Sequence, residues 1–409
     1  MQLKTAVSNI FGAHLLTMEI EPEAHFDDTK IAFSYKTDRQ LKKANFIFTI
    51  VNNPTMSSVA TGLVKVGLTL RLPINGIIRN TVFDHFCGGE TIEDCERTID
   101  ALGKYKVGTI LDYSVEGEKT EAGFDQTCAA VLETFEEAKK SPHVPFCVFK
   151  VTGLADGELL TKIQSKETLS EAETQAFEKV KARVSRICQK ASEMQIPVLI
   201  DAEETWLQEP IDLLARDMMA LHNRQSAIVF TTFQLYRKDS LENLKALHAD
   251  ARQNGFYIGV KLVRGAYMEK ERERAETMNY PDPIQPDKES TDRDFNLALD
   301  YSLNNINDIS VVCGSHNEYS NHYLTELLKK HNIEHSNKHV WFSQLLGMSD
   351  NISFNLANAG YNVVKYVPFG PVRSVMPYLF RRASENTSVA GQSSRELLMI
   401  RKEMKRREL

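Results

Sequence analysis

The sequence predicts an α/β fold: a (βα)8 barrel of the TIM type that carries an α-helical N-terminal extension. From about residue 107 onward, short runs enriched in Val, Ile and Phe alternate with longer amphipathic stretches, which is typical of parallel βα units. Eight such runs fall within roughly 270 residues, the strand number and size of a TIM-type barrel. No G-x-G-x-x-G or Walker sequence follows any run, so a doubly wound nucleotide-binding sheet is disfavoured.

Each predicted strand is a short apolar run that ends in polar residues. Continuous apolar runs of this length are typical of parallel strands that are buried on both faces. Amphipathic patterns between the runs predict helices that include residues 170–194, 207–223, 239–254 and 317–331. In chain order the runs are VGTILDYS, PFCVFKVTG, IPVLIDAEE, AIVFTTFQLY, YIGVKLVRGAY, ISVVCGSHN, HVWFSQLLGM and YNVVKYVPFGP.

The N-terminal region has a different pattern. Helical periodicity at residues 34–51 and 57–72, with a further helix from Ile92, predicts an α-helical region. We therefore predict two parts, a helical extension at residues 1–84 and the barrel at residues 85–409. The terminal charge run RKEMKRREL is interpreted as a solvated helix end.

Composition and charge exclude several classes of protein. The chain has 409 residues and a net charge of -6, which disfavours nucleic-acid binding. Its six cysteines lie far apart without a C-x-x-C, so neither a disulfide scaffold nor a zinc site is expected. No apolar run is long enough to span a bilayer, and the N-terminus reads as neither a signal nor a transit peptide. We expect a cytoplasmic protein with reduced thiols.

In a barrel of this type, polar residues at the C-terminal ends of the strands form the active site. Lys150 is flanked by apolar residues in CVFKVTG, so we expect it to point into the barrel mouth, where a carboxylate or a ligand satisfies its charge. A buried ion pair with Asp201 is an equally good interpretation, and the Schiff-base lysine of an aldolase is a third. The other strand-end candidates are Ser114, Glu118, Glu203, Gln234, Lys261, Arg264, Gly265, Tyr267, His316, Asn317, Gln344, Leu345 and Tyr366.

A pair of arginines follows the last predicted strand. Tyr378, Arg381, Arg382 and Glu385 are spaced i, i+3, i+4 and i+7, so they share one face of a helix. Two guanidinium groups on that face suit the bidentate capture of a small carboxylate.

Two other functional classes are disfavoured. His331, His335 and His339 recur every four residues, as metal ligands on a helix do. They lie in a polar stretch before the seventh strand, so a loop is the better interpretation and no metal is expected. A DNA-binding regulator is set aside because the chain is acidic and has no basic module.

Six strand-end segments together resemble the proline dehydrogenase family, flavin-dependent (βα)8 barrels that oxidise L-proline. The segments are VKLVRGAY, IDAEE, GSHN, FSQLLGM, KYVPFGP and YLFRRASEN. A chance match to one segment would mean little, but together they resemble the family from about His85 to about Ala390.

The resemblance implies that FAD binds noncovalently across the barrel mouth. Many family members have arginine where this chain has Lys261 and lysine where it has Arg264, so positive charge is kept at both positions. A cation beside the flavin stabilises the negative charge that the ring gains on reduction. The ring would be lined by Gln234, Lys261, Arg264, Gly265, Ala266 and Tyr267. The phosphate and ribitol region would be contacted by His316 and Asn317, together with Lys288 and Thr291 from a loop that contains DKEST.

The resemblance also implies the roles of the substrate-binding residues. Asp201 would anchor Lys150 or a nearby tyrosine, and Glu385 would position an arginine. Glu118 would act as a gate that pairs with Arg381 over the bound substrate. The carboxylate of proline would be held by Lys150, Arg381 and Arg382, and its ring would be enclosed by Leu345, Tyr366 and Tyr378.

The implied reaction is hydride transfer from C5 of L-proline to N5 of FAD, giving Δ1-pyrroline-5-carboxylate in the first step of proline catabolism to glutamate. Electrons would pass to a membrane quinone, so a peripheral contact with the inner face of the cell membrane is expected. The product would pass to a separate pyrroline-5-carboxylate dehydrogenase, because no aldehyde dehydrogenase module is present. Hydroxyproline dehydrogenase of the same family is the alternative. Tyr366 favours proline, since hydroxyproline-oxidising relatives tend to have a smaller residue there.

Overall fold

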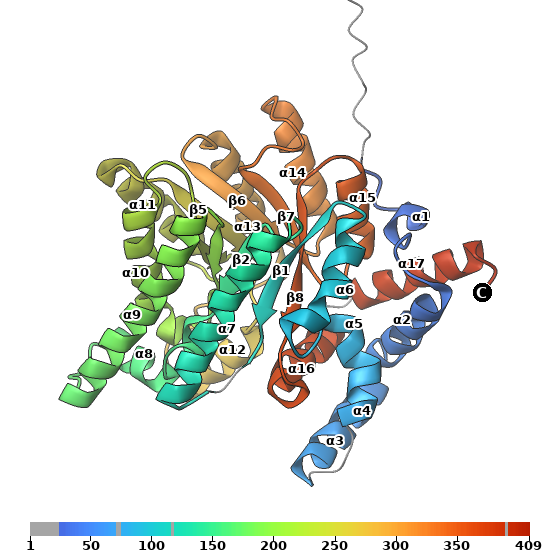
Figure 1. Cartoon of the computed structure of the whole chain (residues 1–409), viewed down its shortest axis with the longest axis horizontal. Coiled ribbons are helices and arrows are strands. Elements are labelled where there is room, and N and C mark those ends of the chain that lie inside the picture. Colours follow the sequence, from blue (N-terminus) through green and yellow to red (C-terminus); the bar gives the residue numbers. More distant parts are fainter. Residues whose placement is uncertain (1–23, 71–74, 116–117, 389–391) are drawn as a thin grey trace, which may run out of the picture.

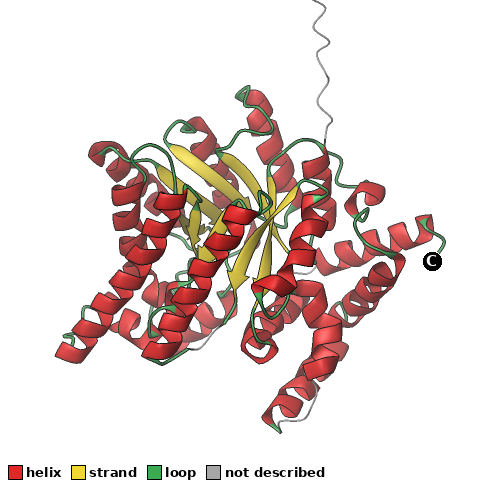
Figure 2. Ribbon diagram, viewed as in Figure 1, coloured by secondary structure: helices red, strands yellow, loops and turns green. Residues whose placement is uncertain are grey.

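Eight parallel strands close into a barrel in the computed structural model, which describes residues 24–70, 75–115, 118–388 and 392–409. Neighbouring strands pair in chain order, and the last strand closes the barrel against the first. The predicted fold class is confirmed, and each strand lies in the run predicted for it (Figure 2). The strands are β1 (Val107–Tyr113), β2 (Phe146–Phe149), β3 (Val198–Ile200), β4 (Val229–Gln234), β5 (Ile258–Val263), β6 (Ile309–Gly314), β7 (Val340–Leu345) and β8 (Val363–Phe369).

Helices surround the barrel and cover the outer faces of its strands (Figure 1). The covering helices are α6 (Ile92–Gly103), α7 (Glu121–Lys140), α9 (Glu171–Met194), α10 (Thr205–His222), α11 (Ser240–Asn254), α13 (Lys288–Asn304), α14 (Glu318–Lys330) and α15 (Asp350–Asn358). The further helices of this part of the chain are α8 (Gly157–Gln164), α12 (Met268–Thr277), α16 (Val372–Ser388) and α17 (Gln392–Arg406). Local sequence sets their starts: α9, for example, begins with a capping box between Ser170 and Glu173.

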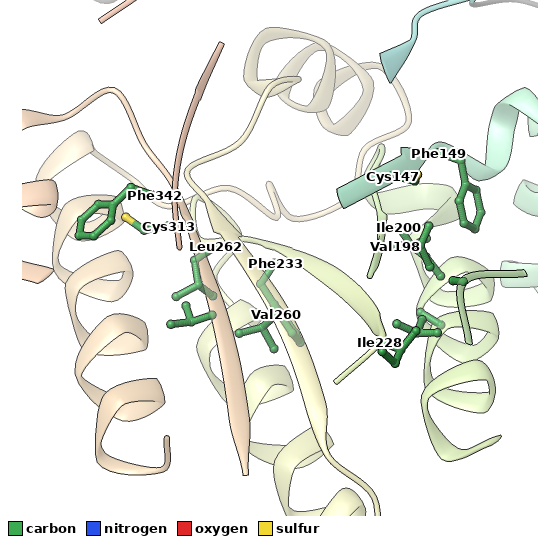
Figure 3. Close-up of a cluster of buried hydrophobic side chains, with 14 of the residues drawn as sticks. Cys147, Phe149, Val198, Ile200, Ile228, Phe233, Val260, Leu262, Cys313 and Phe342 are labelled. Carbon is green, nitrogen blue, oxygen red and sulfur yellow. The ribbon is translucent and has the colours of Figure 1, made fainter. Parts of the chain in front are cut away.

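The strand side chains alternate between two buried cores. Outward-facing side chains such as Phe149, Ile200 and Leu262 belong to the core between the barrel and its helices (Figure 3). Inward-facing side chains such as Val148 and Leu199 fill the barrel interior. Successive strand residues point to opposite faces, and both faces are buried, so residues of both kinds must be apolar. This requirement explains the continuous apolar runs in the sequence.

The N-terminal helices pack against the C-terminal helices beside the barrel (Figure 1). They are α1 (Thr29–Ala32), α2 (Asp38–Val51), α3 (Pro54–Thr69), α4 (Asn75–Ile78) and α5 (Asp84–Phe86), with a π-helical turn at Arg79–Phe83. Helix α2 lies along α17, and α16 contacts α2, α3 and α4. Side chains from both ends of the described chain, including Phe48, Tyr378 and Ile400, form a separate apolar core. Among the residues described, no helix combines the length and apolarity needed to cross a bilayer.

The C-terminal charge run anchors α17 on the N-terminal region. Glu403 is fully buried and accepts hydrogen bonds from the Nε atoms of Arg406 and Arg407, each at 2.7 Å. Arg407 also donates to the carbonyl oxygens of Phe33 (2.7 Å) and Lys36 (2.8 Å). The interpretation of this run as a solvated helix end is confirmed for its exposed residues, Arg401, Lys402, Lys405, Arg406 and Glu408. It is wrong for Glu403 and Arg407, because the first is buried and the second is bound to backbone oxygens of a distant segment.

A buried charge cluster joins the N-terminal region to the barrel. Asp350 accepts a hydrogen bond from the Tyr35 hydroxyl (2.8 Å) and forms ion pairs with Lys36 (3.2 Å) and Lys365 (3.0 Å). Burial alone would raise the pKa of Asp350, but the two lysines hold this pKa below its usual range. The carboxylate therefore stays ionised although it is 1% exposed.

Glu396 connects α17 to the same cluster. Its carboxylate accepts a hydrogen bond from the backbone amide of Ser349 at 2.8 Å, directly before Asp350. Burial, together with the negative charge of Asp350, raises the pKa of Glu396 to about 7. The folded chain therefore holds a proton on Glu396 at pH values where the unfolded chain has released it.

We expect Glu396→Gln to stabilise the fold above neutral pH. In the wild type, stability is lost as pH rises from about 4.5 to about 7, because only the folded state keeps the proton in this window. Glutamine keeps an oxygen for the Ser349 amide and has no proton to lose. In urea unfolding, the stability gain of the variant over the wild type should grow by about 1–3 kcal/mol between pH 5 and pH 8. A gain that is equal at both pH values would contradict this account.

Candidate active site

A cavity opens at the C-terminal ends of the strands, beside α16. It has a volume of about 220 Å³. Its position is the one expected for the active site of a (βα)8 barrel. The predicted site residues that line it are Lys150, Asp201, Gln234, Lys261, Gly265, Ala266, Tyr267, His316, Leu345, Tyr366, Tyr378, Arg381 and Arg382.

The alternation that builds the core also directs polar side chains to the cavity. Val148 points into the barrel, so Lys150, two residues later, points into its mouth. Leu199 and Asp201 have the same relation after β3. The prediction that Lys150 lies within a strand is wrong, because β2 ends at Phe149 and Lys150 begins the loop that follows.

Lys261, Asp201 and Tyr366 form a buried hydrogen-bonded group in this cavity. The ammonium of Lys261 donates to Asp201 Oδ1 and to the Tyr366 hydroxyl (2.5 Å), and this hydroxyl donates to Asp201 Oδ1 (3.2 Å). Burial and the charge of Asp201 raise the pKa of Tyr366 well above its usual value, so the phenol stays protonated. The group places a fixed positive charge, matched by one carboxylate, beside an aromatic ring.

Gln234 joins the loops that follow β3 and β5. Its Nε2 donates to the carbonyl oxygen of Glu203 (2.7 Å), and its Oε1 accepts the backbone amide of Ala266 (3.3 Å). The Glu203 carboxylate in turn accepts the amide of Thr152 (3.0 Å) and bonds its hydroxyl. Burial raises the pKa of Glu203 to about 7. These bonds fix the backbone around the cavity.

His316 is neutral and is held from outside the cavity. Its Nδ1 lies 2.9 Å from the hydroxyl oxygen of Ser349. Burial, followed by the charge of Lys365, lowers the pKa of His316 to about 3. Since the Ser349 amide is bound by Glu396, hydrogen bonds run from α17 to a side chain that lines the cavity.

Helix α16 brings the predicted arginines to the cavity. Arg382 is 8% exposed, and its guanidinium lies 5.1 Å from the ring centroid of Tyr378. The guanidinium of Arg381 lies 6.0 Å from the ring centroid of Tyr267. Lys150 and these two arginines give the cavity three cations in addition to Lys261, and both guanidinium groups lie near aromatic rings.

A second cavity of about 450 Å³ adjoins the first and shares Lys150, Tyr267 and Arg381 with it. The predicted gate residue, Glu118, lines this second cavity. Its carboxylate accepts the backbone amides of the next two residues, each at 2.8 Å, at the start of α7. Glu118 and Arg381 therefore face one cavity, and their pairing over a substrate stays a prediction.

Arg264, predicted to line the cofactor, is not among the residues that line either cavity. Its guanidinium donates to Asp292 (2.7 Å), Ser315 (2.8 Å) and Ser320 (2.9 Å). These partners lie on or beside α13 and α14, so Arg264 joins these helices to the end of β5.

The predicted cofactor contacts Lys288, Thr291 and Asn317 lie outside the cavity lining. Lys288 and Thr291 form the first turn of α13 rather than a loop, because Asp287 caps this helix; their placement in a loop is wrong. Asn317 caps α14 by accepting the Ser320 amide at 3.1 Å. The side chain of Glu385 lies outside the described part of the chain.

Several residues that line the cavity were not among the predicted ones. Asp112 follows the inward-facing Ile110 by two residues, as Lys150 follows Val148, and like Lys150 it is a charged residue within an apolar run. Its carboxylate accepts a hydrogen bond from the Ser114 hydroxyl (2.7 Å). Thr232 and Ser343 gave no comparable signal, because short hydroxyl side chains are common in strands. The further unpredicted lining residues are Ala202, Val263 and Gly314, whereas Gln344, which also lines the cavity, was one of the predicted strand-end candidates.

The three spaced histidines lie apart from this cavity. His335 Nδ1 contacts the carbonyl oxygen of Ala359 (2.9 Å), and its ring stacks on Tyr361. His339 Nδ1 contacts the Ser310 hydroxyl (2.8 Å). Within the described ranges, no group of three or more His, Cys, Asp and Glu side chains is arranged to hold a metal ion.

Comparison with known proteins agrees with the resemblance in the strand-end segments. The family model described as Proline dehydrogenase matches residues 95–395, which include all eight strands. Proline dehydrogenase 1, mitochondrial, from Dictyostelium discoideum is 33% identical over 387 residues, covering 84% of this chain and 67% of that protein. Hydroxyproline dehydrogenase from Xenopus laevis is 30% identical over 412 residues, covering 92% of this chain and 88% of that protein.

A solved structure shares the fold. The crystal structure of proline utilization A from Bdellovibrio bacteriovorus, inactivated by N-propargylglycine, superposes with a TM-score of 0.69 at 21% identity, over 91% of this chain and 40% of that chain. This chain thus spans less than half of that protein. The fold, the span of the family match and the identity to curated relatives agree: the chain belongs to the proline dehydrogenase family.

Proposed function

We propose that the protein oxidises L-proline to Δ1-pyrroline-5-carboxylate with noncovalently bound FAD. The observation that supports this most directly is the meeting, in one cavity, of three cations with the buried Lys261–Asp201–Tyr366 group. The cations suit a carboxylate, and the buried group suits a ring that gains negative charge.

The side chains of the cavity fit a flavin. Bound FAD would supply a hydride acceptor for C5 of proline at its N5. Lys261 is 5% exposed, so the charge of its ammonium is poorly screened and would stabilise negative charge on the flavin ring. Neutral His316 would offer a hydrogen-bonding group without a further charge. Contacts from Arg264, Lys288, Thr291 and Asn317 remain part of the proposal.

Arg381 and Arg382, with Lys150, would hold the substrate carboxylate. A planar guanidinium can bind both carboxylate oxygens, which fixes the orientation of the substrate as well as its position. The cationic lining disfavours a protonated ring nitrogen, so we propose that proline reacts with a neutral amine. In this mechanism the chain contributes mainly orientation and electrostatics, and no general base is required.

Leu345, Tyr366 and Tyr378 would enclose the pyrrolidine ring. Tyr366 is hydrogen-bonded to Asp201 and Lys261, so its bulk is fixed in place. A fixed phenol would leave little room for a ring hydroxyl, which favours proline. The relative from Xenopus laevis is named hydroxyproline dehydrogenase, so hydroxyproline is kept as the second candidate substrate.

We further propose that the electrons pass to a membrane quinone. The product would be consumed by a separate pyrroline-5-carboxylate dehydrogenase, and Glu118 would close over the substrate through Arg381. A quinone acceptor requires a peripheral contact with a membrane.

A visible spectrum during anaerobic addition of L-proline tests the proposal. We expect flavin bands that bleach with proline and bleach far less with trans-4-hydroxyproline. Bound flavin that proline does not bleach would overturn the substrate assignment. A folded, colourless protein that takes up no added FAD would overturn the cofactor as well.

Arg381 and Arg382 form the proposed carboxylate clamp. Replacing either of them should lower kcat/KM for proline without loss of flavin binding. We expect Arg381→Met and Arg382→Met each to lower kcat/KM for proline about 10- to 100-fold, since a hydrogen bond to a charged group contributes about 1.5–3 kcal/mol. Arg373→Met is the matched control, because Arg373 is exposed on the same helix. Equal activity of all three variants would contradict the clamp.

Reducing the bulk at Tyr366 should change substrate preference. We expect Tyr366→Ser to raise the ratio of kcat/KM for trans-4-hydroxyproline to that for proline about tenfold. Tyr366→Phe keeps the ring but removes the hydroxyl, so it should lower kcat/KM for both substrates and leave the ratio of the two values unchanged. A ratio that changes equally in both variants would show that the hydroxyl, rather than the bulk, sets the preference.

A further inference from the structure

One side of α3 and its C-terminal end form an exposed apolar stripe. Met56, Val59, Leu63, Val66 and Leu70 recur at alternating spacings of three and four residues, so they lie in one row. Their exposed fractions range from 47% to 68%. Single exposed apolar residues are common, but a continuous row of large aliphatic side chains indicates a binding surface.

The stripe is carried by a helix that projects from the molecule (Figure 1). On α4, Ile77 adds a further side chain that is 68% exposed. Another side of α3 faces the protein: Ser57 is buried, and Val64 packs against the apolar core that includes Tyr378 and Leu379 of α16. The stripe is therefore fixed relative to α16, the helix that brings the arginines to the cavity.

We propose that this surface docks on an anionic lipid bilayer. Residues 54–70 and 75–83 contain Lys65 and Arg79 but no Asp or Glu, although the whole chain has a net charge of -6. The Arg79 side chain is 55% exposed and forms ion pairs with Glu90 and Asp94. A row of exposed aliphatic side chains suits the interface of a bilayer, and a segment free of acidic residues places no carboxylate against anionic headgroups. The proposed docking surface consists of Met56, Val59, Leu63, Val66, Leu70 and Ile77.

A second copy of the chain fits the stripe less well. The three-and-four spacing also occurs in coiled coils, but α3 offers only two heptads and no Glu–Lys pairs to set a partner. A stable protein–protein interface uses about 20–30 residues on each side, whereas the proposed docking surface has six. A bilayer needs no complementary partner surface, so it is the favoured occupant.

The docking surface has a use only if the proposed function, with its quinone acceptor, is correct. Its test does not depend on that function. A quinone dissolved in the bilayer must come close to the barrel mouth, and α3 contacts the helix that lines this mouth. Binding to lipid can be measured without catalysis. Oxidation of proline with a water-soluble dye as acceptor can be measured without lipid.

Co-sedimentation of the full-length protein, with its bound cofactor, with vesicles tests the docking surface. Vesicles of phosphatidylcholine with phosphatidylglycerol should bind the wild type, and those of phosphatidylcholine alone should bind less. Leu63→Glu/Val66→Glu should lower the vesicle partition coefficient by more than about tenfold, since each buried aliphatic side chain contributes about that factor. Leu213→Glu/Leu221→Glu is the matched control, because both leucines are exposed on α10 (56% and 60%).

Dye-coupled activity of both double variants should equal that of the wild type. If proline oxidation fails in all of them, the proposed function falls while the lipid result still decides the docking surface. Absence of vesicle binding, or binding that Leu63→Glu/Val66→Glu leaves unchanged, would overturn the inference. So would a wild-type dimer in light scattering that this double variant dissociates while vesicle binding is retained.

Leu63→Glu/Val66→Glu could lose vesicle binding because it misfolds, so a second variant reports contact with lipid by a gain of signal. Leu63→Trp should give an emission band that shifts to the blue on anionic vesicles and is quenched by lipids brominated in the acyl chain. Emission that neither shifts nor is quenched, on vesicles that sediment the protein, would show that another surface makes the contact.

Discussion

The period of two along the strands of a closed barrel is the constraint on which the site depends. Each strand side chain faces either the helices or the barrel interior, and pairing on both sides locks every strand in register. Ile110 and Leu199 therefore fill the interior, while Asp112 and Asp201, two residues later, reach its mouth. A slip of one residue in β1 or β3 would move a charge into the helix layer and an apolar side chain into the site.

Two buried lysines show how the fold tolerates charge on both faces of the sheet. Lys261 faces the cavity and is matched by Asp201, whereas Lys365 faces outward and is matched by Asp350. A buried charge without a partner would destabilise the folded state, because its desolvation would not be compensated. The outward pair is connected through Ser349 to His316, so charges in the outer layer help to fix a side chain that lines the cavity.

The architecture could be predicted from the sequence because eight apolar runs and their polar ends are local features. Lys150, Arg381 and Arg382 were found in the same way. Pairings between distant segments are not local features. The family resemblance implied that Asp201 anchors Lys150 or a tyrosine, and Asp201 accepts a hydrogen bond from Tyr366. Nothing local shows that Asp201 also binds Lys261 or that Arg264 turns toward Ser315. The roles of Glu403 and Arg407 in the C-terminal charge run were missed for the same reason, because Arg407 binds a segment more than three hundred residues away.

The packing of α2 against α16 and α17 has a consequence for how the chain folds during its synthesis. About 320 residues separate α2 from α16, and a ribosome that adds about 5–20 residues each second needs tens of seconds to make them. Isolated helices of this length are barely stable in water. The apolar faces of α2 and α3 thus emerge long before the helices that cover them. Productive folding of this region is therefore a late event, and nascent chains are exposed to aggregation until α17 has left the ribosome.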